Sequence, residues 1–236
     1  MTNVGYTIDA RITPKTAAKL LIANEMDLNA PLTEQQASAI LHELSRASVE
    51  DLLKVIDIIE PLEQMDSGTL PQFGSLETLL RVPEIIVSLG FDSLSYTQLG
   101  FYLKGDIHAK QAANAKYGET HAKGACMLGY ASFKQGRLTA SALTDAICAL
   151  EDQELRHRIT TLLCLRIPMI QTLLYRAKDG QVNGYEPMAS LKPSTQKRRG
   201  ICVRMILKEL EHLKDEQLCL RIQNIFWELN EEANPC

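Results

Sequence analysis

Positively charged side chains concentrate in the middle of the chain, where they could bind the phosphates of a nucleic acid. Between positions 104 and 137, six basic residues stand against two acidic ones, a net charge of +4 in a chain whose total is −4. The six are Lys104, Lys110, Lys116, Lys123, Lys134 and Arg137. A local patch of this kind decides what a surface attracts more than the overall charge does. The alternative is an ordinary solvated face, since surface Lys and Arg are common.

A second basic run, Lys197, Arg198 and Arg199, follows Ser194 and Thr195 at the expected start of a helix. Three cations in a first turn are unusual, because a helix N-terminus already carries the positive end of the helix dipole. An external anion would offset that repulsion, and backbone amides beside two arginines suit a phosphate. The run therefore predicts a second phosphate contact, unless its cations pair with nearby acids.

The segment 94–139 must position the first group of cations, and its pattern predicts three short helices followed by a β-hairpin. The start and stop residues are Ser95 with Gln98 in a capping box, then Asp106, Gly118, Thr120 and Gly129. They predict helices over about 96–103, between Asp106 and Gly118, and over 120–128. The stretch 130–139 then has a KQGR tip between Phe133 and Leu138, which is typical of two strands and a turn. This order of elements indicates a winged helix.

In a winged helix, the helix 120–128 would enter the major groove of DNA. It would present Thr120, His121, Lys123 and Gly124, while Ala122, Ala125, Met127 and Leu128 pack inward. On the hairpin, Lys134 and Arg137 would reach phosphates or the minor groove. Lys110 and Lys116 would contact the flanking backbone. These contacts position the protein more than they specify a sequence, so binding independent of sequence also fits.

The segments LSYTQLG, AKYGETHAKGACMLGYA and GRLT, in this order, resemble winged-helix modules of bacterial DNA-binding and restriction- or defence-associated proteins. The resemblance covers about residues 94–150, and STQKRRG resembles a basic helix start near the C-terminus of some such proteins. It implies duplex DNA binding through the helix 120–128 and the hairpin 130–139. The long acidic N-terminal third, with a net charge of −8 over residues 1–103, has no counterpart in a minimal regulator.

The fold class expected for the whole chain is mostly α. We expect an acidic helical region over 1–66, a winged-helix domain over 75–150 and a helical region over 151–236. Helix starts at Pro14, Thr33, Ser48, Ser75, Thr139, Asp152 and Ser194 support this division. The last two helices are expected over about 195–213 and 215–231, with Asn183-Gly184 as a hairpin tip. Residues 64–74 interrupt the pattern, as either a hinge or a surface loop.

Catalytic chemistry has little support in the sequence. There is no glycine-rich phosphate loop, no Gly-x-Ser-x-Gly elbow and no zinc-protease or deaminase motif. The six cysteines form no Cys-x-x-Cys pair and lie among apolar residues, as reduced core side chains do. Neither a metal nor another cofactor is expected, because the five histidines are scattered singly. No apolar run approaches the roughly 18 residues of a membrane span, and no secretory signal is evident, so a cytoplasmic protein is expected.

The sequence therefore predicts a non-catalytic DNA-binding accessory or regulatory protein whose partner is double-stranded DNA. The alternative is a helical subunit of a larger assembly, of a defence or chromosome-organising, kleisin-like kind. In that hypothesis the winged helix docks on a partner protein and the acidic N-terminal helices clasp it. Homo-oligomerisation stays open, and no membrane partner is expected.

Overall fold

The computed structural model describes residues 14–24, 33–90, 93–105, 108, 110–134 and 136–229. Over these residues the chain forms eleven α-helices, two 3-10 helices and two small sheets of two strands each. The expected mostly helical class is confirmed. None of the described helices is long and apolar enough to cross a membrane.

The N-terminal helices follow the sequence prediction closely at their starts. They are α1 (Pro14–Ile22), α2 (Glu34–Arg46) and α3 (Val49–Ile56). The capping box at α2 is present, because Thr33 Oγ1 accepts a hydrogen bond from Gln36 N and Gln36 Oε1 accepts one from Thr33 N. Ser48 caps α3 through a hydrogen bond from Asp51 N to its hydroxyl. The buried faces of these helices join the common core.

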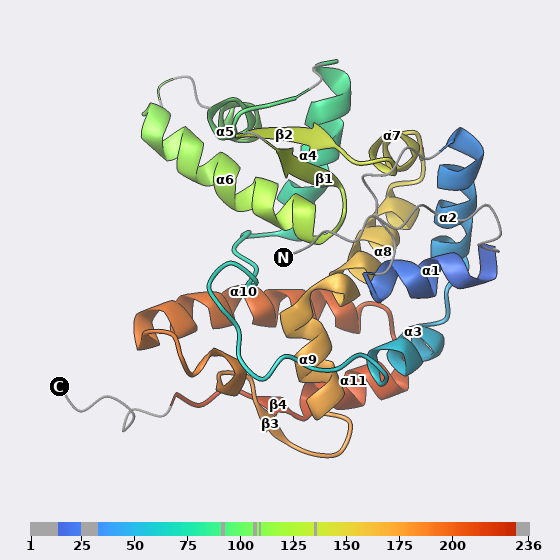
Figure 1. Cartoon of the computed structure of the whole chain (residues 1–236), viewed down its shortest axis with the longest axis vertical. Coiled ribbons are helices and arrows are strands. Elements are labelled where there is room, and N and C mark those ends of the chain that lie inside the picture. The colour runs from blue at the N-terminus through green and yellow to red at the C-terminus, as the bar shows by residue number, and fades with distance from the viewer. Residues whose placement is uncertain are drawn as a thin grey trace.

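Residues 76–140, called the middle module, contain three helices and a hairpin (Figure 1). The elements are α4 (Leu76–Ser88), α5 (Tyr96–Lys104), α6 (Gln111–Met127), β1 (Ala131–Lys134) and β2 (Arg137–Ala140). The expected hairpin is confirmed, with Phe133 paired to Leu138 and Lys134 to Arg137. The capping box of Ser95 and Gln98 is confirmed as well. Leu94 forms an antiparallel bridge to Leu138, which joins the hairpin to the start of α5.

The helix α6 is continuous, so the expected break at Gly118 and the cap at Thr120 are wrong. Gly118 instead lets α5 approach, since a Cβ there would lie 1.9 Å from the Tyr96 carbonyl oxygen. A Cβ on Gly100 would lie equally close to the Asn114 carbonyl oxygen. Thr120 donates its hydroxyl hydrogen to Lys116 O inside the helix. The other expected cap, Asp106, lies outside the described residues.

The C-terminal part departs from prediction at several places. Its elements are α7 (Thr144–Cys148), α8 (Gln153–Leu163), η1 (Cys164–Arg166), α9 (Pro168–Arg176), β3 (Val182–Asn183), η2 (Glu186–Met188), α10 (Pro193–Glu211), α11 (Glu216–Gln223) and β4 (Ile225–Phe226). The helix expected from Thr139 starts later, because Thr139 still pairs in β2. The last expected helix ends at Gln223, where the chain turns into β4. That strand pairs in parallel with β3, so Asn183-Gly184 is not a hairpin tip.

Residues 64–74 are a packed connection between α3 and α4. Met65, Leu70 and Phe73 are buried, and Met65 N donates to Pro187 O over 2.7 Å. Phe73 lies against α6, because a Cβ on Gly124 would meet its ring at 2.5 Å. The segment therefore contacts both the C-terminal helices and the middle module.

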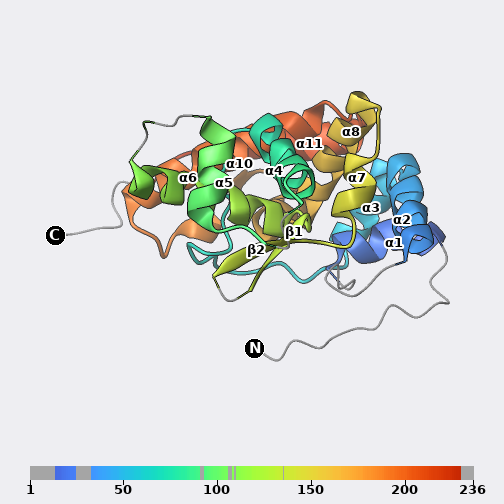
Figure 2. The same ribbon diagram turned by 90° about the horizontal axis from the view of Figure 1, so that it is seen from above.

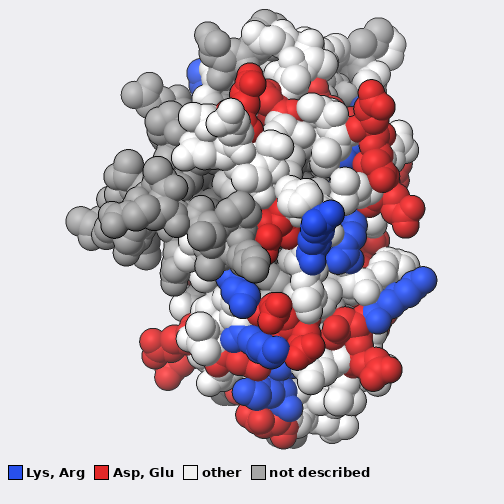
Figure 3. Space-filling model, turned by 90° about the vertical axis from the view of Figure 1, so that its right-hand side faces the viewer, with Lys and Arg blue, Asp and Glu red and all other residues white. Residues whose placement is uncertain are grey.

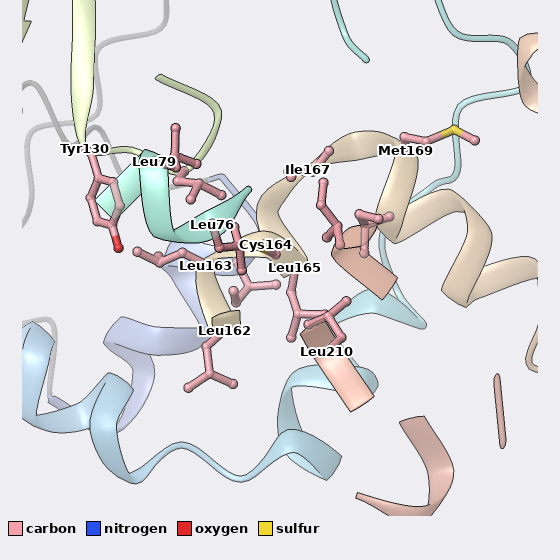
Figure 4. Packing of buried hydrophobic residues seen from close by; sticks show 14 of the residues in the cluster. Leu76, Leu79, Tyr130, Leu162, Leu163, Cys164, Leu165, Ile167, Met169 and Leu210 are labelled. Atoms are coloured by element: carbon pink, nitrogen blue, oxygen red, sulfur yellow. The ribbon is translucent and has the colours of Figure 1, made fainter. Parts of the chain in front are cut away.

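The core centres on the junction of α8, η1 and α9, where most of the residues are apolar and buried. Leu162, Leu163, Cys164, Leu165, Ile167 and Met169 all lie inside. Figure 4 shows them together with Leu76 and Leu79 of α4 and Leu210 of α10. Tyr130, which precedes the hairpin, is also fully buried, and its hydroxyl hydrogen bonds to Thr160 of α8. The middle module is thereby fixed to the rest of the protein, and Figure 2 shows its hairpin at one edge beside α5 and α6.

A bidentate ion pair connects the end of α3 to α11. Arg221 of α11 donates to both carboxylate oxygens of Asp57, at 2.7 and 3.0 Å, and Lys178 Nζ lies 3.5 Å from the same carboxylate. Both members of the Asp57 and Arg221 pair are largely buried. The hydrogen bonds from Arg221 hold the pKa of Asp57 below its usual value.

We expect Gly118→Ala to destabilise the protein by about 2 to 3 kcal/mol, because a well-packed crossing cannot accept the added methyl group. Helix propensity alone would stabilise the Gly118→Ala variant by about 1 kcal/mol. The sign of the change in the free energy of unfolding therefore shows which effect dominates. Urea unfolding measures the difference. The control is Gly74→Ala, where a Cβ would meet no atom within 4 Å. Equal stability of the two variants would contradict the close crossing.

We expect Asp57→Asn to lower the free energy of unfolding at pH 7 by about 2 kcal/mol, because it leaves a largely buried Arg221 without its anion. Since the pKa of Asp57 is lowered by folding, its contribution is complete above the unfolded pKa of about 3.9 and is lost as pH falls through the folded pKa. The difference between wild type and variant should therefore shrink below about pH 4. Asp51→Asn, at an exposed pair with Lys54, should have little effect at either pH.

Candidate nucleic-acid interface

One stripe along α6 faces outward, and packing against α5 and α4 decides which stripe it is. The buried residues of the helix are Asn114, Gly118, His121, Ala122, Gly124 and Ala125. Lys116 is exposed and Thr120 and Lys123 are half-buried, at the three- and four-residue spacing of one helix face. Three of the predicted DNA-binding residues therefore share one side of α6.

Glu119 lies between the two lysines of this stripe. Its carboxylate is 2.9 Å from Lys116 Nζ and 2.7 Å from Lys123 Nζ. Hydrogen bonds from Lys123 and then Lys116 hold the pKa of Glu119 below its usual value. A phosphate approaching the stripe would compete with this carboxylate for both cations.

Two of the residues expected to face outward lie inside. His121 is 3% exposed, and its Nδ1 lies 2.9 Å from Tyr117 O. Burial lowers the pKa of His121, which favours the neutral ring. Gly124 packs against Phe73 and Leu79. The orientation expected for both was wrong, because it assumed a short helix starting at Thr120 in place of one whose position is set by the α5 crossing.

Further cations flank the stripe. Lys110 is the exposed N-cap residue of α6, and Lys104 lies 5.0 Å from the centre of the Tyr117 ring. On the hairpin, exposed Arg137 donates from Nε to Ser93 Oγ and from Nη2 to Ser93 O, at 2.5 and 2.9 Å. Lys134 pairs with Arg137 through the strand register, and its side chain lies outside the described residues.

An aromatic pair joins the hairpin to the start of α5. The rings of Tyr96 and Phe133 stack with their centroids 4.4 Å apart and their planes 10° apart. Burial raises the pKa of Tyr96, and the charge of Glu119 adds to that effect. Because Tyr96 begins α5 with its carbonyl against Gly118 of α6, the pair connects the hairpin to the crossing of α5 and α6.

The second basic run, residues 197–199, does not lie at the start of a helix as predicted. Because α10 begins at Pro193, Lys197, Arg198 and Arg199 lie in its second turn, not its first. Arg199 is buried and donates from Nη2 to Ser67 Oγ over 3.0 Å. Lys197 and Arg198 stay exposed, and Figure 1 places α10 in a different layer from α6. The run is thus not one phosphate site at a helix start.

The N-terminal helices present mixed charges. Lys54 pairs with Glu50 at 2.8 Å and with Asp51 at 3.6 Å, and Lys19 lies 4.0 Å from Asp51. Figure 3, which shows the right-hand side of Figure 1, has basic side chains interspersed with acidic ones. The negative charge expected for the N-terminal helices is therefore partly neutralised at α3.

Sequence reasoning missed Glu119 and Ser93 as partners of the predicted cations. Glu119 could have been found, since it stands three residues after Lys116 and four before Lys123. Ser93 carries no such indication, because it meets Arg137 only through the fold. The sequence indicates that Tyr96 begins a helix, but it carries no sign that its ring stacks on Phe133.

The described residues contain no group of three or more His, Cys, Asp or Glu side chains that could hold a metal ion. Five described cysteines are free; Cys164 is buried in the core, Cys126 packs against it while partly buried, and the other three are half-buried. No known family model, no curated protein and no solved structure matches this chain. Its function is therefore inferred from these residues and their geometry.

Proposed function

We propose that the middle module is a winged helix and that it binds double-stranded DNA, in a protein that acts as a non-catalytic accessory or regulatory factor. The order of α4, the extended residue Leu94, α5, α6 and the hairpin supports the first part. The Leu94 bridge to Leu138 carries the proposal, because it joins the hairpin to the helices. The α6 stripe and Arg137 then belong to one module.

The dimensions of α6 suit a major groove. Its 17 residues span about 25 Å, and B-DNA offers a groove about 12 Å wide. At its first turn, Gln111, Ala112 and Ala113 are exposed, and the small side chains of the two alanines would allow close approach to base edges. Gln111 then takes the base-contacting role expected of His121, since recognition helices read bases mainly from their N-terminal residues.

The cations of the stripe and its flanks would contact phosphates. Lys110, Lys116, Lys123 and Arg137 contribute charge without base recognition, so affinity should depend strongly on salt. Thr120 contributes less than expected, because its hydroxyl hydrogen is already donated to Lys116 O. Exposed Lys197 and Arg198 would form a separate, weaker phosphate contact.

We expect Glu119→Gln to tighten binding to a labelled duplex severalfold at low salt, because it frees two lysines and removes a negative charge. The double variant Lys116→Ala/Lys123→Ala should weaken binding and flatten its dependence on salt by about one unit of slope per lost phosphate contact. Fluorescence anisotropy across a salt series measures both effects. Lys123→Ala/Arg137→Ala should act similarly and would link the hairpin to the same surface.

A matched control exists in α3, where Lys54 contacts Glu50 and Asp51 at the same three- and four-residue spacings. Glu50→Gln and Lys54→Ala should leave duplex affinity nearly unchanged. Equal responses at α3 and α6 would mean that only net charge matters, and no binding by the folded protein at low salt would rule the proposal out.

The second candidate function is docking on a partner protein within a larger assembly. One observation favours it: the neighbouring side chains of Phe101 and Tyr102 on α5 are both exposed. If this is the function, Phe101→Ala/Tyr102→Ala should abolish co-purification of a partner, while Glu119→Gln should have no effect on it.

A further inference from the structure

Phe133 is exposed at a position where the strand register would predict burial. Directly opposed residues of an antiparallel pair point to the same face of a hairpin, and the partner of Phe133 is the fully buried Leu138. Phe133 is nevertheless 39% exposed, because it lies next to the turn, where the hairpin extends past the core. Its ring thus combines a packed side and a solvent-facing side.

Tyr96 supports the ring, and the strand that carries the ring is joined to its partner strand. Tyr96 stacks on it at 4.4 Å, and Tyr96 itself is the first residue of α5, with its carbonyl against Gly118 of α6. On the hairpin, the hydroxyls of Ser132 and Thr139 hydrogen bond across the strands at 2.8 Å. An aromatic ring fixed in this way loses little conformational freedom when a ligand stacks on it.

Two cations lie near the Tyr96 side of this pair. The Tyr96 carbonyl meets Gly118, and the next residue of α6, Glu119, binds Lys116 and Lys123. Arg137, held by Ser93, extends from the other face of the hairpin, because successive side chains of a strand alternate between its faces. An exposed ring beside cations that can hold phosphates is the arrangement by which proteins bind unpaired bases, since every base has a flat face to stack. An apolar protein segment would gain nothing from those cations.

We propose that Phe133, backed by Tyr96, stacks on an unpaired base, so that the middle module prefers DNA in which a duplex continues into a single strand. This inference rests on the proposed duplex binding, because α6 would hold the duplex while the hairpin receives the first unpaired base. The cations position the backbone, and the ring adds the preference for an unpaired base.

The test uses the full chain and two labelled DNA probes, a blunt duplex and the same duplex extended by a short thymidine overhang. Wild type should bind the extended duplex about tenfold more tightly than the blunt one. Phe133→Ala should remove that preference and leave blunt-duplex affinity unchanged, whereas Phe133→Trp should restore it. Phe101→Ala is the matched control. Phe101 is exposed to a similar extent, 38%, but it lies on α5 and packs edge-on against Tyr102, not against Tyr96. Thermal unfolding verifies that each variant folds.

A second measurement identifies the contact directly. With 5-iodouracil at the first unpaired position, irradiation should cross-link the DNA to Phe133, as mapped by mass spectrometry. Equal affinity of wild type for the two probes, or a preference unchanged in Phe133→Ala, would overturn this inference while leaving duplex binding intact. Failure to bind either probe would overturn the proposed function and this inference with it.

Discussion

The close crossing of α5 and α6 determines the geometry on which the rest of the middle module depends. Backbone meets backbone at Gly100 and Gly118, so the two helices can neither rotate nor separate without losing the contact. The crossing fixes which stripe of α6 faces outward, and it turns His121 inward. It also brings the start of α5 beside the middle of α6, so Tyr96 lies near both Glu119 and Phe133. The arrangement of cations and rings follows from this one contact.

The positive charge of the middle module is little reduced by acidic residues. Glu119 is the one described acid between residues 93 and 140, and it pairs with two of the lysines. Solvent reaches all three side chains, which weakens these ion pairs, so a phosphate with several charge-assisted contacts can displace the carboxylate. Before a ligand binds, Glu119 would hold the two lysine side chains in the orientation in which they contact a phosphate.

Local signals in the sequence predicted much of the fold, and long-range contacts account for what they missed. Caps at Thr33, Ser48, Ser75, Ser95 and Asp152 and the hairpin at residues 131–140 are short-range features, and each is present. The helix break expected at Gly118 is wrong. A glycine that ends a helix and a glycine that allows a second helix to pack closely cannot be told apart in the sequence. The same holds for α11, whose early end depends on pairing between β3 and β4. Burial of Arg199 against Ser67 joins positions 132 residues apart, beyond any local pattern.

Counting charges along the sequence overstates the cations available to a ligand. Arg221 is used against Asp57, Arg166 donates to the Leu21 carbonyl at the end of α1, and Arg199 is buried at the 64–74 connection. Each of these arginines stabilises contacts between distant segments, and burial lowers the pKa of Arg166 to about 10. The cations of the middle module differ, because they lie on one helix, its N-cap and the hairpin, where the fold does not bury them. A basic surface is therefore defined by which cations remain accessible after folding, and in this protein those on α6 and the hairpin meet that condition together with an exposed aromatic ring.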